Sequence, residues 1–227
     1  MVEINAQYNV ARPDSLPIRL AAKMRRVMFD EFLRLQTPGT TDSILDVGVT
    51  SDQSYEASNY LEAWYPHKER ITAVGIDDAS FLETKYPGMT FVRADGRDLP
   101  FDDCSFDIVH SSAVLEHVGS AAMQEKFIRE LTRVARRGVF ITTPNRWFPV
   151  EFHSVLPLVH WLPPRQFRAI LSALGHTALA QEENLNLLGP SEVRSVCAHA
   201  VPGLQATVSS VRLFGWPSNI ICSIRRA

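Results

Sequence analysis

The chain has 227 residues, of which 45% are hydrophobic, so it is long enough for one domain with a substantial apolar core. Its 23 Lys and Arg residues nearly balance 25 Asp and Glu residues. The composition therefore lacks the basic excess that gives proteins affinity for phosphate backbones, and we expect no nucleic-acid partner.

The elements alternate along the chain. An amphipathic helix is predicted at residues 16–36, because large apolar residues recur there three or four positions apart. Beyond this helix, short β-branched runs alternate with helical patterns. They predict strands at residues 43–49, 71–76, 89–94, 106–112 and 137–143, and helices at residues 55–65, 78–86 and 124–137. Two final strands, at residues 204–214 and 219–225, are joined by the short turn GWPS and should pair antiparallel.

This order predicts an α/β fold. Continuous apolar strands separated by helices are typical of a parallel sheet covered on both faces. The sheet should have seven strands, five parallel and two in the closing antiparallel hairpin. We expect one domain, divided into an N-terminal helical segment (1–42), a core (43–145), an insertion with helices (146–203) and the hairpin (204–227).

The cellular setting follows from what the sequence lacks. Cys104, Cys197 and Cys222 lie far apart, without the short spacings of a zinc site or the density of a disulfide scaffold. The N-terminal residues have no apolar signal core, and no apolar run reaches the roughly 20 residues of a spanning helix. These features predict a cytoplasmic protein without a transmembrane segment. The oligomeric state is left open.

The most specific stretch is ADGRDLPFDDCSFDIVHSSAVLEHV, residues 94–118, which joins an acidic turn to LPF, SFD and EHV motifs. Together with the order of the elements, it resembles the small-molecule, type 11-like branch of the class I S-adenosylmethionine-dependent methyltransferases. The resemblance covers roughly residues 43–225. It implies a Rossmann-like, doubly wound sheet, S-adenosylmethionine as cofactor and S-adenosylhomocysteine as product.

By this resemblance the cofactor lies at the carboxyl ends of the strands, where open α/β sheets bind ligands. Asp46 and Gly48, after the first strand, would hold the methionine portion. Asp77 would accept hydrogen bonds from the ribose hydroxyls, since an acceptor-only carboxylate suits a diol. Its neighbour Asp78 is read as a helix N-cap.

Two further strand ends complete the implied cofactor site. Asp95 would take the adenine amino group with the Gly96 backbone beside it, although an Asp-Gly turn needs no ligand. Ser111 and Ser112 would contact the cofactor mainly through backbone groups. His117, in the EHV motif, orders its loop or moves protons.

The first loop departs from the family pattern, because Thr50 and Asp52 stand where glycines are usual. Either the loop is reshaped and still binds, or the site has decayed and the chain is a non-catalytic cofactor-binding partner subunit. We expect binding, since only the first glycine is tied to the sharpest turn. A nicotinamide-dependent oxidoreductase is a third hypothesis, which the antiparallel ending and the acidic-turn stretch oppose.

The stretch TPNRWFPVEFHSVLPLVHWLPP, residues 143–164, crowds aromatic and titratable side chains after the fifth strand. It predicts the acceptor side of a small-molecule pocket, with O-methylation as the reaction, although such residues also form cores beneath lids. His153 is predicted to orient or deprotonate the acceptor. No metal site is predicted, because Glu151 and His153 lack a third ligand at a recognisable spacing. The predicted substrate-binding residues are Trp147, Glu151, His160 and Trp161.

Overall fold

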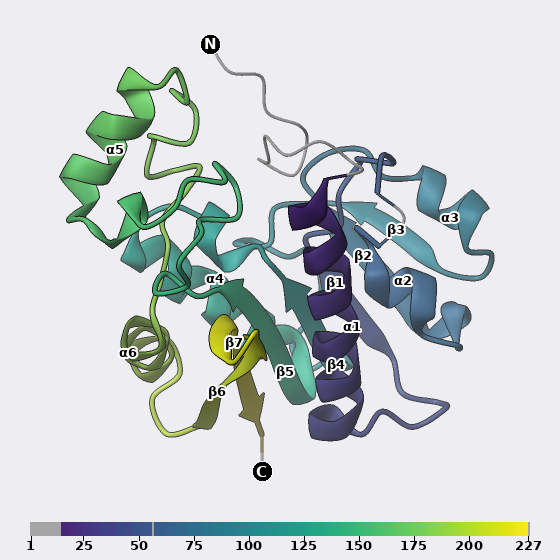
Figure 1. Cartoon of the computed structure of the whole chain (residues 1–227). Helices are drawn as coiled ribbons and strands as arrows, with labels where there is room; N and C mark the ends of the chain where they lie inside the picture. The colour runs from purple at the N-terminus through teal and green to yellow at the C-terminus, as the bar shows by residue number, and fades with distance from the viewer. Residues whose placement is uncertain (1–14, 56, 227) are drawn as a thin grey trace.

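A computed structural model describes residues 15–55 and 57–226 of the chain (Figure 1). The polar start assigned to the N-terminal segment, residues 1–14, lies outside the described residues. Seven strands form one sheet in the order β3-β2-β1-β4-β5-β7-β6. The strands are β1 (Ile44–Val47), β2 (Ile71–Gly75), β3 (Thr90–Arg93), β4 (Phe106–Ser112), β5 (Ala135–Pro144), β6 (Gln205–Leu213) and β7 (Trp216–Arg225).

The pairing confirms the predicted fold class. Strands β1 to β5 pair in parallel, and β7 pairs antiparallel with both β5 and β6. The last two strands follow each other through a short turn, so β7 has no crossover helix and enters the sheet in the opposite direction. The result is a doubly wound sheet with an antiparallel edge.

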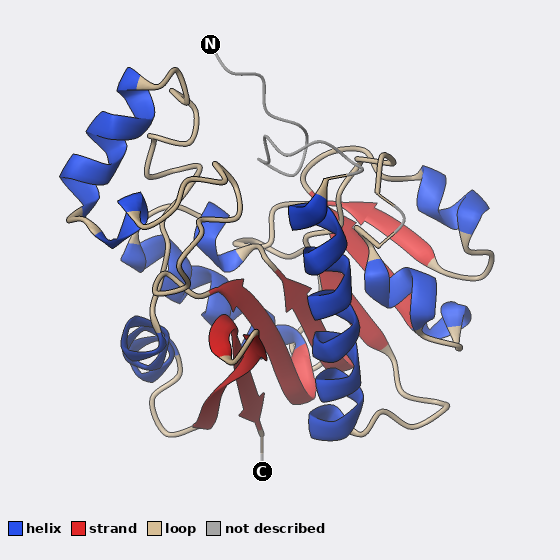
Figure 2. Ribbon diagram, in the orientation of Figure 1, coloured by secondary structure: helices blue, strands red, loops and turns tan. Residues whose placement is uncertain are grey.

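Helices cover both faces of the sheet (Figure 2). On one face, α1 (Leu16–Gln36), α2 (Tyr60–Trp64) and α3 (Phe81–Lys85) contribute to one apolar cluster. On the other face, α4 (Ala121–Val134) and α6 (Pro190–Ala200) contribute to a second. Neighbouring residues of one strand divide between the clusters: Ile108 packs in the first and Val109 in the second. This alternation is the period of a strand buried on both faces.

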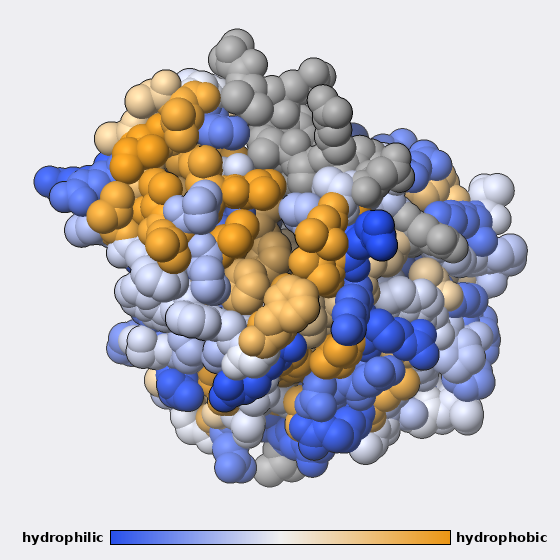
Figure 3. Space-filling model, viewed as in Figure 1, coloured by the Kyte–Doolittle hydropathy of each residue, from blue (hydrophilic) through white to orange (hydrophobic). Residues whose placement is uncertain are grey.

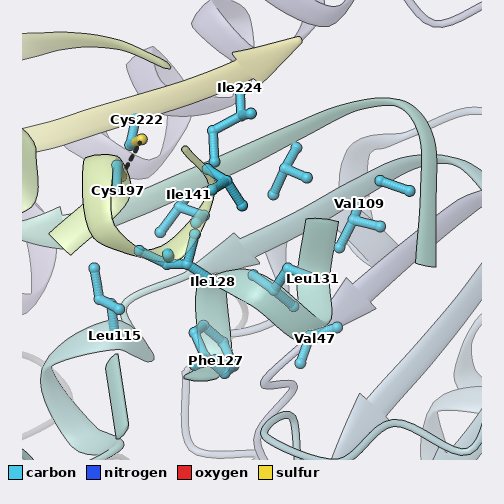
Figure 4. Packing of buried hydrophobic residues seen from close by; sticks show 14 of the residues in the cluster. Val47, Val109, Leu115, Phe127, Ile128, Leu131, Ile141, Cys197, Cys222 and Ile224 are labelled. Carbon is cyan, nitrogen blue, oxygen red and sulfur yellow. Dashed lines mark hydrogen bonds between the residues drawn. The ribbon is translucent and has the colours of Figure 1, made fainter. Parts of the chain in front are cut away.

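The α4 cluster is drawn in Figure 4, where Phe127, Ile128 and Leu131 of α4 lie among strand residues such as Val47 and Val109. Cys197 of α6 and Cys222 of β7 meet in the same cluster with their sulfur atoms 3.1 Å apart, as free thiols. Helix α6 therefore belongs to the core of the sheet, although the sequence grouped it with the insertion.

Helix α5 (Pro164–Ala173) lies apart from the sheet with its own small cluster around Phe167 and Leu171. Figure 3 shows apolar surface over α5 and the loops that adjoin it, and Leu158, Leu162 and Leu174 are among the exposed apolar residues of this region. None of the helices among the described residues combines the length and the apolar character needed to cross a bilayer.

One predicted boundary is wrong. The sequence placed a helix at residues 124–137, but α4 ends at Val134 and β5 begins at Ala135. Arg136 and Arg137 belong to the start of β5, and each makes an ion pair there. Arg136 pairs with Asp107, and Arg137 pairs with Asp42. The predicted helices at residues 55–65 and 78–86 are also shorter in the structure, as α2 and α3.

A buried polar cluster lies between β1 and the α1 face. His110 Nδ1 is 2.7 Å from Asp46 Oδ1, and its Nε2 is 2.9 Å from the Tyr60 hydroxyl. Burial raises the pKa of Asp46 to about 7 and lowers that of His110 to about 4. Glu62 of α2 is fully buried beside them, and burial together with the Asp46 carboxyl raises its pKa well above 4.5. Glu62 therefore keeps its proton to a higher pH in the folded protein than in the unfolded chain.

Replacing Glu62 by Gln should change how stability depends on pH. Above pH 4.5 the unfolded chain releases the Glu62 proton while the folded state keeps it, so this group lowers the wild-type free energy of unfolding as pH rises. The slope is up to about 1.4 kcal/mol per pH unit. Because glutamine does not titrate, the melting temperature of Glu62→Gln relative to wild type should increase between about pH 5 and 8. A difference that stays constant over this range would contradict a raised pKa.

Candidate functional site

A cavity with a volume of about 280 Å³ lies at the carboxyl ends of the parallel strands. Residues that follow β1, β2, β3 and β4 form its floor. Helix α1 closes one side, and Phe152 and His153, from the segment after β5, close another. This is the crevice where open α/β sheets bind their ligands.

Five of the predicted cofactor residues line this cavity, namely Gly48, Asp77, Asp95, Gly96 and Ser112. Asp46 and Ser111 do not. The Asp46 side chain belongs to the buried cluster with His110, and the Ser111 hydroxyl donates to the carbonyl of Val47 at 2.8 Å. These two side chains make hydrogen bonds within the sheet and do not face the cavity.

The turn after β1 requires glycine at position 48. Gly48 has φ +106°, and a Cβ there would lie 2.0 Å from Cγ2 of Val114. Thr50 and Asp52 have no positive φ, so the loop does not need the two usual glycines. Instead, Asn59 accepts a hydrogen bond from the Thr50 amide at 2.9 Å and donates to the Thr50 carbonyl at 3.0 Å. The loop is reshaped and held by side chains.

The two aspartates after β2 differ in their surroundings. Asp77 lines the cavity, is exposed, and makes no hydrogen bond or ion pair with another described residue. Asp78 accepts a hydrogen bond from the backbone amide of Ser80 at 3.0 Å, at the start of α3. The N-cap of α3 is Ser80, so the prediction that Asp78 caps the helix is wrong: its carboxylate is held in a turn just before α3, whereas the Asp77 carboxylate is available to a ligand.

Asp95 is engaged within its own turn. Its carboxylate accepts the Arg97 amide at 2.8 Å and pairs with the Arg97 guanidinium at 2.6 Å, and these contacts lower the pKa of Asp95. The amide of Asp98 also donates to the Asp95 carbonyl at 2.9 Å. Asp95 therefore forms the Asp-Gly turn that needs no ligand, and a ligand that bound Asp95 would share its carboxylate with Arg97.

A cluster of two carboxylates and two imidazoles lies at the inner wall. His153 Nδ1 is 2.6 Å from Glu151 Oε1, and His153 Nε2 is 3.1 Å from Nε2 of His117. His117 Nδ1 is 2.5 Å from the carbonyl of Asn184. The Thr143 hydroxyl donates to Glu116 Oε2 at 2.8 Å. His117 and His153 both line the cavity, whereas the two glutamates are buried behind them.

The pKa values of the groups in this cluster are shifted in different directions. Burial would raise the pKa of Glu151, but the charge of His153 and the hydrogen bonds from His153 and Ser154 lower it to about 2. Burial would likewise lower the pKa of His153, but the carboxylate of Glu151 outweighs it and raises the value. Burial and the neighbouring His153 lower the pKa of His117 to about 3. These shifts favour an ion pair between Glu151 and His153 and a neutral His117, while burial raises the pKa of the neighbouring Glu116 to about 7.

The other predicted substrate residues lie elsewhere. His160 is buried, and its Nε2 is 2.7 Å from the carbonyl of Phe148. Trp161 stacks on Trp216 with ring centroids 6.4 Å apart, and Trp147 is 43% exposed. None of His160, Trp161 and Trp147 lines the large cavity, and Glu151 reaches it only through His153. Their contact with a substrate stays a prediction.

Sequence reasoning missed one whole wall of the cavity. The spacing of three or four residues in α1 predicted an amphipathic helix, and Met24 and Met28 are buried. The same helix face also borders the cavity, and the position of α1 over the strand ends was the missing information. Its lining residues are Pro17, Ile18, Ala21, Met24, Arg25 and Met28.

Comparison with known proteins gives a consistent result. Residues 45–142 match the family model described as a methyltransferase domain. A "probable S-adenosylmethionine-dependent methyltransferase" of Mycobacterium tuberculosis is 32% identical over 81 residues, which are 34% of this chain and 28% of that protein. Ajmaline N-methyltransferase of Rauvolfia serpentina is 41% identical over 76 residues, 34% of this chain and 24% of that protein. The matches thus span about a quarter of these relatives.

A solved structure extends the likeness to the whole fold. The N-methyltransferase NodS of Bradyrhizobium japonicum, in complex with S-adenosyl-L-homocysteine, aligns with a TM-score of 0.53 at 11% identity. The alignment covers 94% of this chain and 89% of that chain. At this identity the likeness concerns the fold, and it includes the strand order described above.

Replacing Gly48 by Ala should destabilise the protein by roughly 2 kcal/mol or more, because it combines a strained backbone with a clash against Val114. Denaturant unfolding measures this. Gly39→Ala is the matched control, since a Cβ there meets only ordinary contacts with Asp42, at 3.5 Å or more. Equal stability of the two variants would show that the turn relaxes without glycine.

Proposed function

Because the chain belongs to the class I S-adenosylmethionine-dependent methyltransferases, we propose that it transfers a methyl group to a hydroxyl of a small molecule bound in the cavity. The observation that carries this proposal is the convergence of strand-end acceptors and the Glu151–His153 pair on one cavity. The enclosed cavity and the near-neutral charge of the chain favour a small acceptor over a nucleic acid.

The residues present fit the cofactor of the family. Asp77 offers an unshared carboxylate to a ribose diol, and Gly48, Gly75 and Gly96 let the strand ends approach a ligand closely. When bound, S-adenosylmethionine supplies an electrophilic methyl group on a sulfonium. The decayed-site alternative, a non-catalytic partner subunit, is not favoured, since Asn59 holds the altered loop in place and both histidines reach the cavity.

The chemistry needs orientation and one proton transfer. The acceptor oxygen attacks the methyl carbon in line with the breaking carbon–sulfur bond, whose electron pair remains on sulfur. The protein therefore mainly holds the two groups in contact. The hydroxyl proton must leave, and His153 in its neutral form would orient that hydroxyl or receive the proton at Nε2, the atom that lies 3.1 Å from His117 Nε2. Glu151 fixes the ring through Nδ1 and stabilises the imidazolium that forms.

An amine acceptor is the competing possibility, because ajmaline N-methyltransferase is among the relatives. The buried Glu151–His153 pair favours oxygen, since an amine that is already neutral needs less help from a base than a hydroxyl does. A methyl-acceptor screen with metabolite fractions, followed by identification of the methylated atom, decides between the two.

Asp77→Ala should weaken binding of S-adenosylhomocysteine by roughly 1.5 to 3 kcal/mol, about tenfold to a hundredfold or slightly more, through loss of charge-assisted hydrogen bonds. Asp78→Ala, a change at the neighbouring aspartate whose carboxylate is bonded to the Ser80 amide, should leave the affinity unchanged. Isothermal titration calorimetry measures both. Failure of the wild-type protein to bind at millimolar ligand would overturn the proposed function, and an unchanged affinity in Asp77→Ala would remove the role of Asp77.

His153→Ala should reduce turnover by roughly a hundredfold while leaving S-adenosylhomocysteine affinity unchanged, because loss of a positioned base costs about this much. His199→Ala, which removes an exposed imidazole far along α6, is the control. The assay follows methyl transfer to the acceptor found in the screen. A turnover within about twofold of wild type would exclude His153 from the reaction.

A further inference from the structure

We propose that Glu116, His117 and His153 form a binding site for a divalent metal ion of the Zn²⁺ class at the inner wall of the cavity. One carboxylate oxygen and two imidazole nitrogens of these residues lie within 4.8 Å of one another. Two imidazoles and a carboxylate are a ligand set that Zn²⁺ takes in catalytic sites, with the fourth position left open.

The distances between the ligand atoms are close to those of a coordinated ion. His117 Nε2 and His153 Nε2 are 3.1 Å apart, and Glu116 Oε1 is 3.9 Å from His117 Nε2. Two nitrogens bound tetrahedrally to one Zn²⁺ at about 2.0 to 2.1 Å would be roughly 3.3 Å apart. Glu116 Oε1, the third ligand, would move toward the two nitrogens to complete the set.

The hydrogen bonds on the far side of each ring direct the nitrogen lone pairs inward. His117 Nδ1–H donates to the carbonyl of Asn184, and His153 Nδ1–H donates to Glu151. Metal-bound histidines almost always donate their other N–H to a carbonyl or carboxylate in this way. With both Nδ1 atoms protonated, two neutral rings would direct two Nε2 lone pairs at each other. A cation, either a proton or a metal ion, must lie between them.

Glu116 supplies an independent observation. Its side chain is fully buried, and Oε2 accepts the Thr143 hydroxyl, but Oε1 has no hydrogen-bond partner among the described residues. Leaving a buried carboxylate oxygen unsatisfied is costly. A shared proton between the two histidines would not satisfy Oε1, whereas a metal ion bound by all three residues would. This favours the metal ion over the proton.

The site would serve the acceptor, and this part of the inference rests on the proposed function. Because His117 and His153 line the cavity, the open coordination position faces the bound small molecule. A hydroxyl coordinated there loses its proton more easily, as water does on Zn²⁺. The carboxylates of Glu116 and Glu151 together balance two positive charges. Here His153 would act as a ligand, and the metal would acidify the acceptor.

The experiment measures metal uptake by the full chain without any methyl transfer. The purified protein is stripped with a chelator, dialysed, and titrated with ZnCl₂ against a chromophoric zinc chelator. We expect one Zn²⁺ per chain, with affinity about a hundredfold lower in Glu116→Gln and in His117→Asn, each of which replaces a ligand with a side chain of similar size. His199→Asn, at an exposed histidine, should bind as wild type does.

A thermal shift provides a second readout, since Zn²⁺ that binds the folded state should raise the melting temperature of wild type but not of the two ligand variants. Circular dichroism checks that each variant is folded, and the wild-type stoichiometry decides the question if a variant is not. Absence of stoichiometric uptake of Zn²⁺, Mn²⁺ or Fe²⁺ by wild type, or equal uptake by folded Glu116→Gln, overturns the proposal. Binding of S-adenosylhomocysteine by the stripped protein tests the proposed function separately.

Discussion

The candidate site depends on one constraint of topology, the position of β1 between β2 and β4. From β1 the chain winds outward in one direction through β2 and β3, and in the other through β4 and β5. The connections therefore diverge above β1, and a crevice opens at the carboxyl ends of the strands. Gly48 makes the turn that follows β1 at that crevice, and Asn59 holds the loop that comes after it. Without this divergence, Asp77 and His153 would not border one cavity.

Most of this arrangement could be predicted from the sequence, because strands and turns are formed by residues that are close together in the chain. Short β-branched runs and turn residues predicted the seven strands, and the family resemblance assigned Gly48, Asp77 and Asp95 to the cofactor site at the strand ends. The altered loop could not be predicted in the same way, because it is held by Asn59, nine residues further along the chain, whose two hydrogen bonds to Thr50 are not visible in the glycine pattern. The missing glycines at Thr50 and Asp52 suggest a disrupted loop, but the folded loop is held by hydrogen bonds.

The inner wall could not be predicted because its members are far apart in sequence. His117 and His153 are 36 residues apart, on opposite sides of α4 and β5, and no periodic pattern joins them. Sequence reasoning paired Glu151 with His153 and found no third ligand for a metal ion. The fold instead places Glu116 and His117 on the other side of His153. Similarly, His160 was predicted to bind the substrate, but its ring makes a hydrogen bond with the carbonyl of Phe148.

The two buried glutamates beside His153 differ in how completely their oxygens are satisfied. Glu151 accepts hydrogen bonds from the amides of His153 and Ser154, from the Ser154 hydroxyl and from the His153 ring. Glu116 accepts one, from Thr143. Glu151 is thus fully hydrogen-bonded beside the His153 ring, whereas Oε1 of Glu116, a carboxyl group whose pKa burial raises to about 7, has no hydrogen-bond partner among the described residues. Because a carboxyl oxygen of Glu116 lies within 4.8 Å of a nitrogen of each imidazole, the proposed metal ion would bind there, next to the cavity where the acceptor would bind.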